Sequence, residues 1–189
     1  MDDINPEDYP TLVQVGRFAR LIADISWFRN IGEPLSNDVR ELARAYGDAL
    51  GFPGADVAQI YDWDEAAATL ETHDLNSPAW EAEEQLLSAL HHQALDILDP
   101  QMLEVALTHV NSQASDAITD RVMSAADLWG IEDEELLRAS IGTAIHACYQ
   151  AALVVAAGES EDHPFALKFR LFEKGWWPLG IVGNTLNIF

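Results

Sequence analysis

The chain has 189 residues, of which 49% are hydrophobic and 22% are charged, and these values suit one compact globular domain. Its 32 acidic and 10 basic residues give a formal net charge of −22, which repels nucleic-acid phosphate and anionic lipid and argues against direct binding to either. One cysteine excludes an intrachain disulfide, and acidic residues 1–5 lack the basic and apolar regions of a secretory signal, so we expect a cytoplasmic protein.

Residues 10–51 predict a pair of amphipathic helices. Apolar side chains recur every three or four positions in both, as one face of a helix requires. The first helix is expected over about residues 10–30, and the second begins at Ser36, whose hydroxyl suits a helix cap. Glycine and proline follow each helix and end it, at Gly32 and Pro34 and at Gly51 and Pro53.

Residues 56–73 show no clear periodicity. We expect short helical pieces there, the second of which contains residues 64–68.

Three long helices are predicted over residues 77–158. Ser77-Pro78 and Asp99-Pro100 each combine a capping side chain with a proline in the first turn, and both therefore mark a helix start. The acidic residues 132–135 suit the start of the third helix, which Gly158 ends. Because the connections are short, we expect an antiparallel up-down-up core closed by the two N-terminal helices.

The segment 164–189 predicts a further helix and a β-hairpin. Pro164 near its start and Gly175 beyond its end suit a helix, although Phe165, Leu167, Phe169 and Leu171 also alternate as in a strand. We favour the helix because both of its boundaries carry the expected residues. Gly183-Asn184 suits a two-residue hairpin turn. The expected fold is thus mainly all-α, an antiparallel bundle of about six helices with a small C-terminal β-hairpin, in a single domain over residues 1–189.

Four residues of two neighbouring predicted helices are candidate metal ligands: His91, His92, Asp96 and His109. His92 and Asp96 are four positions apart and therefore share a helix face. If the two helices form a hairpin around Asp99, His109 would lie level with His91 and His92. This arrangement would hold a divalent metal, although the sequence lacks Glu-x-x-His and His-Glu-x-x-His and requires no cofactor.

Motifs for catalysis are missing from the sequence. There is no Gly-x-Ser-x-Gly and no phosphate-binding loop, and Cys148 falls on the apolar stripe of a predicted helix, where a thiol is inert. Acidic pairs such as Asp116 with Asp120 are expected by chance among 32 acids and indicate a solvated face. These observations weigh against an enzyme.

Basic and aromatic residues gather near the C-terminus, at Lys168, Arg170, Lys174, Trp176 and Trp177. They either cover one end of the bundle, with the tryptophans in the core, or form a docking surface rich in the residue types of binding hot spots. We therefore predict a non-enzymatic module that acts through protein–protein contacts, with a protein partner or a second copy of itself. A metal-binding bundle is the alternative, and an acidic mimic of nucleic acid is the weaker one.

Overall fold

Helices dominate the structure, a computed structural model that describes residues 8–73 and 77–189. Of the described residues 67% are helical, and these residues form seven helices and one three-stranded sheet, so the mainly all-α class is confirmed. In chain order the elements are α1 (Pro10–Ile22), α2 (Asn37–Leu50), β1 (Asp56–Gln59), α3 (Trp63–Glu71), α4 (Pro78–Ile97), α5 (Pro100–Trp129), α6 (Glu134–Ala156), α7 (Pro164–Glu173), β2 (Pro178–Val182) and β3 (Thr185–Ile188).

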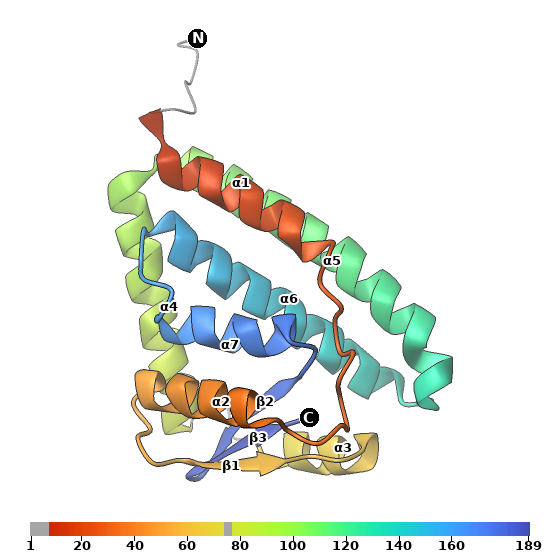
Figure 1. Ribbon diagram of the computed structural model, residues 1–189. Helices are drawn as coiled ribbons and strands as arrows, with labels where there is room; N and C mark the ends of the chain where they lie inside the picture. The colour runs from red at the N-terminus through yellow and green to blue at the C-terminus, as the bar shows by residue number, and fades with distance from the viewer. Residues whose placement is uncertain (1–7, 74–76) are drawn as a thin grey trace.

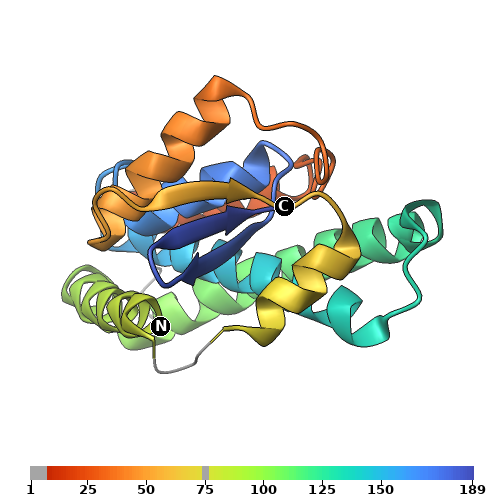
Figure 2. The same ribbon diagram turned by 90° about the horizontal axis from the view of Figure 1, so that it is seen from below.

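The helices lie in successive layers (Figure 1). α1 packs beside α5, and α6, α7 and α2 follow in turn, with the sheet and α3 at the far side. α5 and α6 are antiparallel neighbours, as expected, whereas α4 lies across one end of the other helices (Figures 1 and 2). The connection explains this: Leu98 and Asp99 both have extended backbones, with ψ of 143° and 142°. Proline disfavours a helical residue before it, so the chain turns aside instead of folding back.

The starts and ends of the long helices follow the predicted capping chemistry. The Ser77 hydroxyl accepts a hydrogen bond from the Trp80 backbone N–H at 3.2 Å, and Asp99 accepts one from the Gln101 N–H at 2.9 Å. Asp133 caps α6 in the same way, and Gly130 ends α5 in the left-handed conformation with φ of 68°. Local sequence therefore sets these boundaries.

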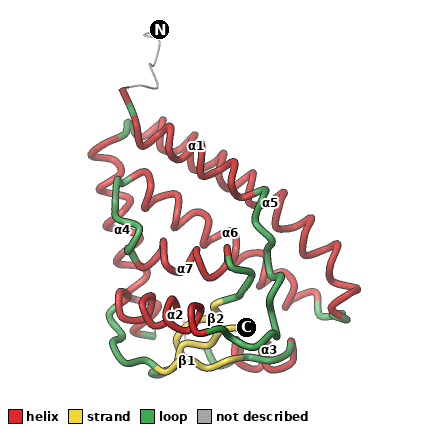
Figure 3. The backbone as a smooth tube through the Cα atoms, viewed as in Figure 1, coloured by secondary structure: helices red, strands yellow, loops and turns green. Residues whose placement is uncertain are grey.

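The first helix is shorter than predicted. α1 ends at Ile22 rather than near residue 30, and residues 23–36 form a long loop (Figure 3). The Trp27 indole N–H donates to the Ile22 carbonyl at 3.2 Å and so satisfies one of the oxygens that a helix end leaves free. Phe28 follows with a positive φ of 58°, and its buried ring packs against the Phe172 and Trp177 rings. Burial of these two rings thus outweighs the helical periodicity.

The hairpin forms as predicted but belongs to a larger sheet. β2 and β3 are antiparallel around Gly183-Asn184, and β3 also pairs in parallel with β1, from Asp56 opposite Thr185 to Gln59 opposite Ile188. The strand β1 replaces the first of the helical pieces expected in 56–73, while α3 confirms the second. A hairpin is marginal alone, and the third strand stabilises it.

The helical interpretation of residues 164–173 is confirmed by α7. α6 has the length and apolar composition of a membrane-crossing helix, yet 56% of its most apolar window is buried inside the protein, as in a core helix.

Candidate functional site

The four candidate metal ligands do not converge. His91, His92 and Asp96 lie exposed on α4, and His109 lies exposed on α5. Because α4 crosses the end of the bundle, the helical hairpin on which their alignment depended does not form. The His92 Nδ1 atom instead lies 2.8 Å from the Ser88 carbonyl of its own helix. Over residues 8–73 and 77–189, no three His, Cys, Asp or Glu side chains gather closely enough to hold a metal ion.

The predicted C-terminal interaction residues divide between core and surface. Trp176 is 4% exposed and Trp177 is fully buried, so both indoles belong to the core. Arg170 pairs with Glu161 at 3.0 Å, and Lys174 is exposed at the end of α7. In this structure the tryptophans therefore cover the bundle and offer no ring to a partner.

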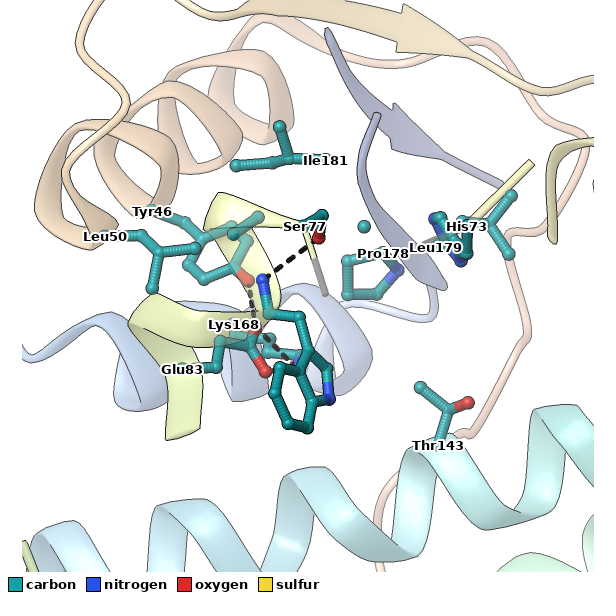
Figure 4. A pocket seen from close by; sticks show the side chains of 13 residues that line it. Tyr46, Leu50, His73, Ser77, Glu83, Thr143, Lys168, Pro178, Leu179 and Ile181 are labelled. Atoms are coloured by element: carbon teal, nitrogen blue, oxygen red, sulfur yellow. Dashed lines mark hydrogen bonds and ion pairs between the residues drawn. The ribbon is translucent and has the colours of Figure 1, made fainter. Parts of the chain in front are cut away.

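A small pocket of about 160 Å³, lined by both apolar and polar side chains, lies where α2, α4, α7 and β2 meet (Figure 4). Tyr46 comes from α2, Glu83 from α4 and Lys168 from α7, and the three side chains point toward one another. The Lys168 ammonium donates to both carboxylate oxygens of Glu83 at 3.0 Å, and the Tyr46 hydroxyl donates to the same carboxylate at 2.6 Å.

Gln150 of α6 completes this network. Its amide oxygen accepts from Lys168 at 3.3 Å, and its amide N–H donates to Glu83 at 3.2 Å. Lys168 thus uses all three of its donors, and the Glu83 carboxylate accepts four bonds. This closed network of hydrogen bonds joins four helices and leaves none of its reactive groups free. We therefore interpret it as a structural feature that holds the helices together, and we call these four residues, Tyr46, Glu83, Gln150 and Lys168, the lock.

Electrostatics keep this lock in its charged form. Burial alone would raise the pKa of the Glu83 carboxyl, but the charge of Lys168 and the hydrogen bonds from Tyr46, Lys168 and Gln150 outweigh it and lower the pKa. Burial first, and then the neighbouring Glu83 charge, raise the pKa of the Tyr46 phenol, which therefore remains a donor. Burial also raises the pKa of the Cys148 thiol, which keeps that side chain unreactive.

Acidification should weaken the fold through Glu83. Its pKa is lower in the folded chain than its ordinary value of 4.5, so its contribution to stability is complete above that pH and is lost as the pH falls through the folded value. Urea unfolding at a series of pH values should show this loss below about pH 4.5. The Glu83→Gln variant should lose less stability over the same interval, and an identical decline in both proteins would contradict the assignment.

A second hollow, of about 710 Å³, lies between α1 and α5. Its lining is mainly apolar, and Asp99, Gln101 and His109 supply the polar groups. The apolar part consists of Leu12, Val15, Gly16, Met102, Val105 and Ala106. Val105 is 64% exposed, and a Cβ added at Gly16 would meet no atom of the described residues within 4 Å. We call this hollow the α1–α5 groove.

Sequence reasoning missed both features, although it singled out Lys168, Asp99 and His109 for other reasons. Glu83 lies inside an acidic run that resembles a solvated face, yet it is the partner of Lys168, one of only two lysines in the chain. Gly16 in the middle of a predicted helix was the available signal for the groove, because glycine there is unfavourable without a packing reason. Comparison of the chain with protein-family models, curated proteins and solved structures returned no match.

Proposed function

We propose that the protein is an interaction module that binds an α-helical segment of a partner protein in the α1–α5 groove. The observation that carries this proposal is the groove itself, an apolar hollow of about 710 Å³ bordered by two helices. Its size and lining are those of a binding site, and grooves between helices are a common seat for amphipathic helices.

Gly16 supports a site where a bound segment can approach α1 closely. Glycine inside a helix lowers stability by roughly 1 kcal/mol relative to alanine. Packing within the described chain gives no reason for it, because the position of a Cβ at Gly16 is open. The missing side chain does, however, leave room at the groove for the backbone or a side chain of a bound segment.

Charge indicates a basic partner. The net charge of −22 attracts cationic segments over a distance and repels acidic ones. Asp99 lines the groove, and at about 100° per residue Asp116 lies about 20° and Asp120 about 60° from Val105 around α5. A helix with an apolar stripe and basic flanks would therefore make its apolar contacts in the groove beside Asp99, while the carboxylates farther along α5 attract it without contact.

A pair of matched substitutions on α5 tests the proposal. Val105 and Met123 are 64% and 59% exposed, and they are 18 residues apart (123 − 105), about five turns, so they share a face. Only Val105 lines the groove. Because both side chains are largely exposed, we expect both positions to accept glutamate without loss of core packing, and both variants gain the same charge.

The probe is a fluorescein-labelled helix of about 18 leucine and lysine residues with one apolar face, and fluorescence anisotropy measures its affinity. We expect Val105→Glu to weaken binding by about tenfold or more, because a carboxylate would be buried in the apolar groove. Met123→Glu should leave the affinity unchanged. A scrambled peptide of the same composition controls for attraction by charge alone.

Three outcomes would overturn the proposal. The scrambled peptide could bind as tightly, the two variants could lose affinity equally, or the amphipathic peptide could fail to bind. Analytical ultracentrifugation adds a fourth: a wild-type dimer that Val105→Glu converts to a monomer would identify a second copy of the chain as the occupant.

A further inference from the structure

A third hollow, of about 340 Å³, lies on the other side of α5, between α5 and α6. It is lined by Asn111, Gly142, Ile145, His146 and Tyr149, none of which belongs to the α1–α5 groove or to the lock around Lys168. Its chemistry therefore has to be explained separately.

Asn111 lacks a hydrogen bond that a buried amide normally makes. Its Oδ1 atom is buried and has no partner among the described residues. The oxygen and nitrogen of an amide are hard to tell apart, but exchanging them leaves the same position without a partner. An unsatisfied buried polar group is unfavourable, and rotation about the broad terminal torsion of asparagine can turn it toward the hollow.

Aromatic rings form one wall of the hollow. The His146 and Tyr149 rings lie 6.3 Å apart and nearly parallel, with an interplanar angle of 11°. Burial, and then the charge of Lys168, lower the pKa of His146 despite the opposing effect of Glu83 and Glu84, so its imidazole is neutral at pH 7. None of the five lining residues carries a charge at this pH, so the two rings present an uncharged aromatic surface with polar ring atoms to the hollow.

Gly142 leaves space beside these rings. It is exposed in the interior of α6, and a Cβ there would meet no described atom within 4 Å. As at Gly16, the packing of the chain gives no reason for a helical glycine. An added side chain would narrow the hollow without disturbing the core.

We infer that this hollow binds an uncharged heteroaromatic ring that carries an N–H donor. The ring would stack on the His146–Tyr149 wall, where offset aromatic contact is favourable, and its N–H would donate to Asn111. Two sources share this chemistry, a free heteroaromatic molecule and the side chain of a tryptophan in a protein. The inference is independent of the helix-binding role of the α1–α5 groove.

Calorimetry with indole and 1-methylindole tests the inference, because the second compound keeps the ring but lacks the N–H. The wild-type protein should bind indole about tenfold more tightly, the effect of one hydrogen bond to a buried acceptor. Asn111→Leu should remove this difference. Gly142→Leu should abolish binding of both compounds, and Gly16→Leu, which fills the other groove, should leave both affinities unchanged.

Each alternative result contradicts the inference. Equal affinities in the wild type, or a preference that persists in Asn111→Leu, would exclude Asn111 as the acceptor. Loss of binding in Gly16→Leu alone would place the ring in the α1–α5 groove, and no measurable heat would indicate a hydrated hollow only. If indole binds, N-acetyltryptophanamide in the same assay distinguishes the two sources. A site for a tryptophan side chain has to admit the backbone groups of this compound, whereas a site for a free molecule does not.

Discussion

Replacing Lys168 by methionine is expected to lower the free energy of unfolding by about 3–5 kcal/mol, as is usual when one partner of a buried ion pair is removed. Lys168 is 8% exposed, and its ammonium makes three hydrogen bonds, two to Glu83 and one to Gln150. The substitution leaves the Glu83 carboxylate buried without a cation. Urea unfolding followed by circular dichroism measures the loss.

Two further variants separate the ion pair from other effects. Lys174→Met removes the only other lysine, an exposed one, and should change stability by about 0.5 kcal/mol or less. Combining Lys168→Met with Glu83→Gln removes both charges and should recover part of the loss, because no buried charge remains unpaired. Additive losses in the double variant would show that the two residues do not act as a pair.

Trp177→Ala is expected to lower the free energy of unfolding by about 3–5 kcal/mol, since it removes a fully buried indole. The ring contacts Phe28, Trp63 and Phe189, with centroid distances of 5.9, 6.0 and 6.4 Å. These neighbours come from three separate parts of the chain, so the cavity cannot be filled by one local shift. Thermal and urea unfolding both measure the effect.

The matched control is Trp80→Ala, because Trp80 is 43% exposed at the start of α4. Its removal should change stability by no more than about 1 kcal/mol. A small effect of Trp177→Ala, equal to that of Trp80→Ala, would argue that Trp177 is accessible in solution and would restore the docking interpretation of the C-terminal tryptophans.

The features that could be predicted from sequence are those governed by neighbouring residues. Ser77, Asp99 and Gly130 act on backbone groups within a few positions of themselves, and the helices they bound are found where the sequence places them. The turn at Gly183-Asn184 is local in the same sense. Short-range chemistry of this kind depends little on the rest of the fold.

The features that could not be predicted depend on distant partners. β1 becomes a strand only because β3 lies beside it, and residues 23–30 leave the helix because Trp27 and Phe28 are buried against α7 and Trp177. The same limit applies to the sites. Glu83 and Lys168 are 85 residues apart, and the α1–α5 groove joins residues of the first helix to those of the fifth.

The central place of β3 in the sheet also constrains how the chain can fold. β3 joins β2 by a two-residue turn, but its parallel partner ends at Gln59, 126 residues before Thr185 (185 − 59). Closing so long a loop is entropically unfavourable, so β1 and β3 can pair only after the intervening helices have brought the two strands close together. The pairing of β2 with β3 is local and needs no such closure, whereas the pairing of β1 with β3 completes the sheet late, and amide hydrogens of β1 should gain protection after those of α5 and α6.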